Sequence, residues 1–165
     1  MITAKNGIYK LDTDNTSYIF RECESGHLQH MYYGRKIHAD AQVLCEKHVS
    51  IPGNTNIYSP DFNNFSLEDM CLEMSSWGKG DIREPFIEVS HADGSSTSDF
   101  LFESSEITLG KEESETLPGS YDEDGNVGHL TVILKDSNYN LKLELHYYVS
   151  VSYTHLRAHE TLMNL

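Results

Sequence analysis

Basic residues, cysteines and long apolar runs are all scarce in this sequence. Its 165 residues include 12 lysines and arginines against 26 aspartates and glutamates, which gives a formal net charge of −14. Phosphate backbones and anionic membrane surfaces attract basic faces, so neither nucleic acid nor a membrane is an expected partner. The 3 cysteines, Cys23, Cys45 and Cys71, show no Cys-x-x-Cys spacing. Their odd number argues against a disulfide framework.

The sequence also lacks the apolar segments that direct a chain to a membrane or across it. No window approaches the roughly 20 apolar residues of a membrane-spanning helix. The first residues form no apolar run of signal-peptide length, so we expect a cytoplasmic protein. A chain of 165 residues is long enough for one domain with its own hydrophobic core.

What the sequence does contain is a period of two, seen most clearly in the stretch YNLKLELHYYV. One side of this predicted strand carries the apolar residues Leu141, Leu143, Leu145, Tyr147 and Val149. The other side, expected to face water, carries Lys142, Glu144, His146 and Tyr148. Such alternation is typical of an amphipathic β-strand.

Similar patterns, separated by turn-forming residues, recur along the chain. Strands are predicted over residues 7–11, 17–23, 27–33, 85–91, 99–103, 106–109, 129–135 and 141–149. Many short strands at this spacing predict an all-β protein, an antiparallel sandwich or barrel. One short helix is expected where Ser66 caps Leu67, Met70, Cys71 and Met74 at helical spacing. Residues 43–64 show no clean period and predict a long loop, a common place for function.

No metal or cofactor site is expected. His27 and His30 stand three apart on a predicted strand, where such positions face opposite sides and cannot share one ion. Each cysteine is isolated and is best interpreted as a small buried residue. The paired carboxylates lie in capping or loop contexts, and the sequence has no glycine-rich phosphate loop and no Gly-x-Ser-x-Gly elbow.

The stretch WGKGDIREP carries the strongest candidate for recognition. It places Trp77, Asp81 and Arg83 on a glycine-rich hinge before a predicted strand. One interpretation is a polar loop in which Arg83 pairs with Glu84 or Asp81, worth about 0–1 kcal/mol if exposed. The other is a recognition edge, since tryptophan offers a flat apolar face and arginine a five-donor fork. Residue chemistry alone leaves both open.

Four stretches together resemble the N-terminal domain of glycoside hydrolase family 36 α-galactosidases. They are TSYIFRECESGHLQHMYYGR, SLEDMCLEMSSWGKGDIREPFIEVSHADGSSTSDFLFES, ETLPGSY and LTVILKDSNYNLKLELHYYV, which occur in this order within residues 1–150. The resemblance implies a large antiparallel β-sandwich, a supersandwich, with at most one or two short helices. It also implies a following (β/α)8 barrel with two catalytic aspartates, which cleave terminal α-linked galactose of melibiose and raffinose-type sugars with retention.

Neither catalytic aspartate of the family maps to a residue of this chain. The resemblance therefore implies an accessory domain that is inactive alone, whose partners are the barrel of the same chain, galactosides through the full enzyme, and further copies in a homo-oligomer. Near the Tyr58-Ser59-Pro60 element it implies a pocket border at Asn54 and Thr55. Trp77, Asp81 and Arg83 become a docking edge. The alternative is a free-standing carbohydrate-binding or oligomerisation module.

The last residues differ in character from the rest. Residues 151–161, VSYTHLRAHET, resemble the translated read-through of a sequencing adaptor. We therefore expect a β-sandwich domain over residues 1–150 and a non-native tail over residues 151–165. The spacing of His155 and His159 would suit two metal ligands on a helix, but we set it aside as part of the tail.

Overall fold

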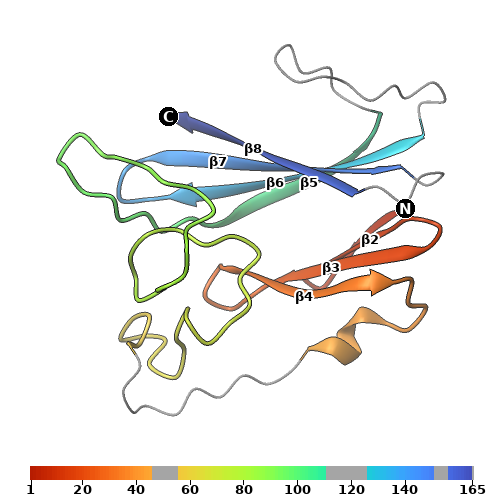
Figure 1. Ribbon diagram of the computed structural model, residues 1–165, viewed down its shortest axis with the longest axis horizontal. Helices are drawn as coiled ribbons and strands as arrows, with labels where there is room; N and C mark the ends of the chain where they lie inside the picture. The colour runs from red at the N-terminus through yellow and green to blue at the C-terminus, as the bar shows by residue number, and fades with distance from the viewer. Residues whose placement is uncertain (46–55, 111–125, 151–155, 165) are drawn as a thin grey trace.

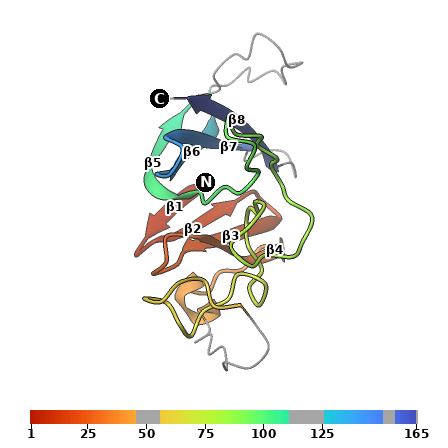
Figure 2. The ribbon, with the colours of Figure 1, turned by 90° about the vertical axis from the view of Figure 1, so that its left-hand side faces the viewer.

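The chain folds into two antiparallel β-sheets that pack face to face. The computed structural model, shown in Figure 1, describes residues 1–45, 56–110, 126–150 and 156–164. Each sheet has 4 strands, in the orders β1-β2-β3-β4 and β5-β6-β7-β8. Figure 2 shows the two layers from the end, one above the other. The predicted all-β antiparallel sandwich is confirmed.

The first sheet is a meander of short strands. Its strands are β1 (Ile2–Lys5), β2 (Ile8–Asp12), β3 (Thr16–Glu22) and β4 (Leu28–Arg35). Asn6 and Gly7 join β1 to β2 with φ of 52° and 72°, as the two-residue hairpin turn favoured by strand twist requires. Ile19 pairs with Tyr32 but Phe20 pairs with His30, so Met31 is an extra residue that bulges β4.

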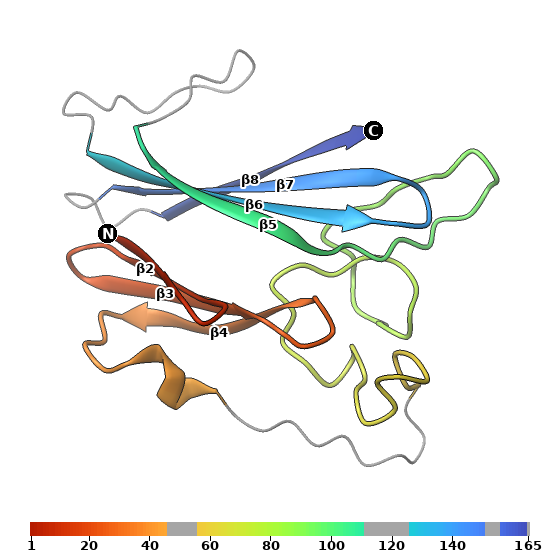
Figure 3. The same ribbon diagram turned by 180° about the vertical axis from the view of Figure 1, so that it is seen from behind.

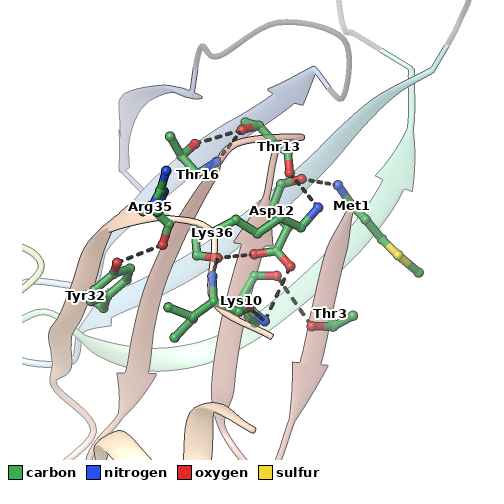
Figure 4. Close-up of polar contacts among 11 residues, drawn as sticks. Met1, Thr3, Lys10, Asp12, Thr13, Thr16, Tyr32, Arg35 and Lys36 are labelled. Carbon is green, nitrogen blue, oxygen red and sulfur yellow. Dashed lines mark hydrogen bonds and ion pairs between the residues drawn. The ribbon is translucent and has the colours of Figure 1, made fainter. Parts of the chain in front are cut away.

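Polar contacts close one end of this sheet (Figure 4). Lys36 Nζ donates to the carbonyl oxygen of Thr13 at 2.8 Å, and the Oγ1 atoms of Thr13 and Thr16 lie 2.8 Å apart. The terminal amino group of Met1 donates to the carbonyl oxygen of Asp12. These contacts fix the β2–β3 turn and the chain that leaves β4.

The second sheet has longer strands. They are β5 (Leu101–Leu109), β6 (Val127–Asp136), β7 (Leu141–Ser150) and β8 (Leu156–Asn164). The strands predicted at 99–103 and 106–109 are one strand, β5. A bulge at Glu103 interrupts its pairing with β6, since Phe102 pairs with Leu134 and Ser104 with Ile133. Because a bulge adds one residue to a strand, it interrupts the alternation of apolar and polar residues from which strands were predicted.

The core lies between the sheets and is built by alternation. Its buried members from the second sheet are Leu130, Val132, Leu134, Leu141, Leu143, Leu145, Tyr147 and Val149. From the first sheet come Tyr9, Leu11, Phe20 and Leu28. Every residue predicted on the apolar side of β7 is therefore in the core. Aromatic packing joins the two sheets, with the stacked Phe20 and Tyr147 rings 5.1 Å apart.

The outer side of β7 departs from the prediction at two residues. His146 and Tyr148 were expected to face water, yet both are buried. The reason is His129 on β6, whose Nε2 lies 3.0 Å from His146 Nδ1 and whose ring stacks on Tyr148 at 4.3 Å. Rings on neighbouring strands thus shield one another, which the pattern of a single strand cannot reveal.

The helix predicted from Ser66 does not form. Residues 66–74 are irregular, although Leu67, Met70 and Met74 are buried and Cys71 is exposed. The apolar spacing therefore selected three of its four inward residues correctly, was wrong at Cys71, and assigned the wrong backbone. The structure instead has a short 3-10 helix, η1 (Ala41–Leu44), which Asp40 caps by accepting from Gln42 N at 3.0 Å. Within the described residues, no helix has the length and apolar character needed to span a membrane.

Residues 85–91 do not form a regular strand either, and two strands were missed. The segment has one isolated parallel bridge, between Ser76 and Ile87. β1 was missed because only 4 residues form it. β8 was missed because it lies in residues 151–165, set aside as a tail. Its backbone pairs with β7 from Val149 opposite Leu156 to Leu141 opposite Asn164. The foreign origin of this segment stays a prediction.

Candidate docking surface

The long segment that connects the first sheet to the second carries the residues predicted to act in recognition. Residues 56–100 contain no regular helix or strand and lie at one end of the sandwich, as Figure 3 shows. An irregular segment of this length needs side-chain anchors, since it has few ladder hydrogen bonds. The structure supplies three, centred on Arg83, Asp99 and Glu73.

Arg83 is the anchor closest to the predicted docking edge. Its Nε and Nη2 lie 2.9 and 3.2 Å from the two carboxylate oxygens of Asp81. The other donors reach back to the main chain, Nη2 to the carbonyl oxygen of Leu67 at 2.6 Å and Nη1 to that of Met70. Of the two partners considered from the sequence, the structure selects Asp81.

This geometry gives Arg83 an inward-facing role. The Asp81 side chain is 1% exposed and that of Arg83 is 37% exposed, so the pair is half sheltered from water. Because the guanidinium holds the carbonyl oxygens of Leu67 and Met70, it ties residues 66–74 to the hinge. The Leu67 carbonyl oxygen also accepts from Met70 N at 3.3 Å, so this irregular turn is held from both sides.

The backbone of the hinge has a conformation that only glycine adopts without strain. Gly78, Lys79 and Gly80 all have positive φ, at 99°, 59° and 86°, a conformation that glycine adopts without strain. At Gly78 a Cβ would lie 2.4 Å from Thr97 Cγ2. The hinge therefore needs glycine for both its dihedral angles and its close approach to the neighbouring chain.

Asp99 is the second anchor, and it gathers three donors from distant segments. Tyr58 OH donates to it at 2.8 Å, while His27 Nε2 lies at 3.2 Å and Lys79 Nζ at 3.4 Å from its carboxylate. Burial alone would raise the pKa of Asp99, but the hydrogen bonds and the charges of His27 and Lys79 outweigh it and lower that pKa overall. The pKa of Tyr58 is raised by burial and by its bond to this carboxylate.

Ser25, His27 and Asp99 are the residue types of a catalytic triad, but their geometry differs from that of a triad. Ser25 Oγ lies 3.0 Å from His27 Nδ1, and Asp99 lies on the Nε2 side. In serine hydrolases the two ring nitrogens have the opposite partners. All three residues are buried, so a substrate could not reach the hydroxyl. The arrangement is a structural link between β4 and the start of β5.

Glu73 is the third anchor, and it lies between the sheets. Its side chain is 4% exposed. One carboxylate oxygen accepts from Tyr18 OH at 2.5 Å and from Tyr147 OH at 2.9 Å, and the other lies 3.1 Å from His30 Nδ1. Burial and the charge of Glu73 both raise the pKa of Tyr18 and of Tyr147, so both phenols remain donors at ordinary pH. Nothing in the sequence pointed to this role beyond an acidic residue between Leu72 and Met74.

His27 and His30 contact different partners, the first Asp99 and the second Glu73. The two histidines thus contact separate carboxylates, although His27 precedes β4, which begins at Leu28. Among the described residues, no group of three or more histidine, cysteine, aspartate or glutamate side chains is placed to hold a metal ion. Cys23, Cys45 and Cys71 are free cysteines, and burial raises the pKa of the Cys23 thiol.

Three large apolar side chains remain on the outside of the hinge segment. Trp77 is 44% exposed, Ile82 78% and Phe86 52%. From residue 81 to residue 90 burial alternates strictly, with the even-numbered residues exposed. The Ser76–Ile87 bridge places Trp77 on the outer side with the even-numbered residues, because side chains of paired segments alternate in step. We call Trp77, Ile82 and Phe86 the apolar face.

The predicted site residues thus separate into distinct places. Trp77 belongs to the apolar face, whereas Asp81 and Arg83 anchor the segment beneath it. The proposed pocket border, Asn54 and Thr55, lies outside the described residues. The anchors Glu73 and Asp99 were not predicted, since their partners come from positions 20 to 74 residues away.

Comparison with known proteins supports the resemblance. The family described as "Glycosyl hydrolase family 36 N-terminal domain" matches residues 26–165. The chain is 30% identical over 141 residues to the bifunctional alpha-galactosidase/sucrose kinase AgaSK of Mediterraneibacter gnavus, covering 85% of this chain and 15% of that protein. It is 27% identical over 143 residues to alpha-galactosidase 1 of Pediococcus pentosaceus, covering 86% of this chain and 20% of that protein.

Solved structures show the same fold. The alpha-galactosidase of Lactobacillus brevis superposes with a TM-score of 0.85 at 28% identity, over 94% of this chain and 21% of that one. Alpha-galactosidase AgaB of Geobacillus stearothermophilus gives a TM-score of 0.90 at 22% identity, over 99% of this chain and 22% of that one. The chain thus spans about a fifth or less of the length of these relatives. It belongs to the glycosyl hydrolase family 36 N-terminal domain family.

Proposed function

We propose that this chain is the accessory domain of a retaining α-galactosidase that acts on terminal α-linked galactose, as in melibiose and raffinose. The catalytic (β/α)8 barrel belongs to the part of the parent protein beyond these residues. The apolar face packs against that catalytic part, and the three anchors hold it in place. The chain alone hydrolyses no galactoside, because the catalytic aspartates belong to the barrel.

The single observation that carries the proposal is the contrast within the hinge segment. Trp77, Ile82 and Phe86 are 44–78% exposed, while Arg83 and Asp81, between them in sequence, are fixed by short hydrogen bonds. Large apolar side chains on a rigid support mark an interaction surface more specifically than scattered exposed residues do. A partner that covers them gains roughly 1.5–3 kcal/mol for each side chain fully buried.

The relatives supply the chemical context. Alpha-galactosidase AgaA of Geobacillus stearothermophilus has been solved in complex with raffinose, and its fold matches 95% of this chain with a TM-score of 0.87 at 23% identity. This domain covers 22% of that protein, so most of that chain lies elsewhere. Cytoplasmic location and assembly into a homo-oligomer belong to the same proposal.

A domain exchange tests the proposal. This chain replaces the corresponding region of AgaA, and the purified chimera is assayed for raffinose hydrolysis and for assembly by sedimentation. We expect an active chimera, and we expect the paired substitutions Trp77→Ser and Phe86→Ser to reduce assembly and activity together. Leu109→Ser is the matched control, since Leu109 is 83% exposed on β5. Equal assembly of the apolar-face variant and the control would refute docking.

Isothermal titration of the chain with melibiose separates this proposal from the carbohydrate-binding alternative. An accessory domain gives no heat of binding with melibiose, whereas a sugar-binding module that uses Trp77 as its platform saturates.

A further inference from the structure

β5 forms one edge of the second sheet. In the part of the chain that the structure describes, it pairs with β6 alone, and Figure 2 shows it at the side of that layer. Gly110, just after β5, donates its N–H to the carbonyl oxygen of Val127 at 2.9 Å, so the main chain of Gly110 faces β6. Because successive main-chain groups of a strand point to opposite sides, those of Ser105, Ile107 and Leu109 face away from β6.

The free part of this edge is limited at both ends. Phe102 donates its N–H to the carbonyl oxygen of Gly26 at 2.8 Å, so the turn before β4 occupies the start of the edge. At the other end, β5 stops at Leu109. Among the described residues, the outward N–H groups of Ser105, Ile107 and Leu109 have no hydrogen-bond partner. Ile107 is therefore the centre of the free stretch.

We propose that two copies of this chain pair antiparallel through β5, with a two-fold axis at Ile107. An unpaired strand edge is a template for pairing with another chain, and two identical copies that meet through the same surface form a closed dimer. Ile107 then lies opposite Ile107 of the partner subunit, and Ser105 lies opposite Leu109 of the partner subunit. Because the main chains of these residues face outward, each such pair exchanges two hydrogen bonds.

The charges on β5 make the edge complementary to itself in this register. Glu106 lies opposite Thr108 of the partner subunit, whereas a two-fold axis at Glu106 would place two glutamates directly opposite each other, which is unfavourable. An axis at Thr108 would leave Ser105 beyond the end of the partner strand. Glu103, the other carboxylate of β5, is already held by Lys142 Nζ at 2.8 Å. A second copy therefore fits this edge without opposing charges of the same sign, although each chain carries a formal charge of −14.

Apolar side chains beside the axis add to the contact. Ile107 is 44% exposed and Leu109 is 83% exposed. They lie on the same side of β5 as Ser105, whose Oγ lies 2.9 Å from Tyr9 OH on the first sheet. Pairing brings the two copies of Ile107 together on this side, which removes apolar surface from water. The edge is separate from the apolar face, and it rests on the proposed function only in giving the proposed homo-oligomer an interface.

Sedimentation velocity of the 165-residue chain tests the proposal. We expect the sedimentation coefficient to rise with concentration towards that of a dimer, and to rise further with added salt, which screens the like net charges of the two copies. Ile107→Lys and Ile107→Glu each place like charges across the axis, so each variant alone should stay monomeric. Their equimolar mixture should dimerise, because lysine then faces glutamate. A monomeric unsubstituted chain, a self-associating single variant or a monomeric mixture would overturn the proposal.

Two controls separate β5 from other surfaces of the chain. Leu109→Ser keeps the pairing main chain, and the double variant Trp77→Ser, Phe86→Ser leaves β5 unchanged, so both should still dimerise. Loss of the dimer in either control would overturn pairing through β5. Amide hydrogen exchange at Ile107 should be about tenfold slower in the dimer than in the monomer, and equal rates would contradict the assignment. Docking to the catalytic part is judged in the AgaA chimera, so either proposal can fail without the other.

Discussion

Arg83→Ala is the substitution that most sharply tests how the hinge is held. It removes the bonds to the Asp81 carboxylate and to the carbonyl oxygens of Leu67 and Met70. Asp81, with a side chain only 1% exposed, then loses its guanidinium partner. Breaking a buried ion pair from one side costs about 3–5 kcal/mol.

The expected loss is smaller here because water can enter from the arginine side. The Arg83 side chain is 37% exposed, so we expect a fall of about 2–3 kcal/mol in the free energy of unfolding. For a domain of this size that corresponds to a decrease of roughly 4–12 °C in Tm. Urea unfolding followed by the fluorescence of Trp77, the single tryptophan, measures it on the hinge itself.

Two further variants separate the effect of the guanidinium hydrogen bonds from the effect of a changed charge. Glu84→Ala removes an exposed neighbouring charge and should change stability by less than about 0.5 kcal/mol. Arg83→Lys keeps the charge but loses the planar fork, so it should recover only part of the loss. If the free energy of unfolding of Arg83→Ala lies within about 0.5 kcal/mol of that of the unsubstituted chain, the guanidinium does not anchor the segment.

The other predictions concern the remaining anchors and the glycine hinge. Gly78→Ala should lower the Tm of thermal unfolding by more than Gly94→Ala does. Both glycines have positive φ, but only at Gly78 would a Cβ lie 2.4 Å from Thr97 Cγ2. Equal decreases in Tm would refute the steric argument. The folded-state pKa of Asp99 is lowered, so its contribution to stability is present above its unfolded pKa of about 3.9 and is lost as pH falls through the folded value. Asp99→Asn should therefore flatten the acid limb of a stability–pH curve, and an unchanged limb would contradict this. Glu73→Leu leaves buried phenol donors without their acceptor and should cost about 1–3 kcal/mol in urea unfolding; no loss would show that the carboxylate is dispensable.

The sequence predicted the strands because their signal is local. Alternation alone identified the core side of β7, and its five predicted residues are all buried in the core: Leu141, Leu143, Leu145, Tyr147 and Val149. It failed at His146 and Tyr148, whose burial depends on His129 across the sheet. It also failed at residues 66–74, where helical spacing was satisfied by an irregular chain held by Arg83.

The candidate surface was predictable only in outline. The unusual glycines and the lone tryptophan marked the hinge, and Arg83 paired with Asp81 was one of the two partners considered. The roles of Glu73 and Asp99 were not predicted, because the hydrogen-bond donors that contact each carboxylate come from separate strands and loops. A buried carboxylate and a surface carboxylate look alike in sequence, and only the fold distinguishes them.

The central claim is that the apolar face is covered by the catalytic part of a galactosidase. Hydroxyl-radical footprinting with mass spectrometry measures the exposure of Trp77 and Phe86 directly, in the chain alone and in the AgaA chimera. We predict that oxidation of both side chains falls at least severalfold in the chimera while Met163, 37% exposed on β8, serves as an internal reference. Equal oxidation of Trp77 and Phe86 in the two proteins would contradict the account.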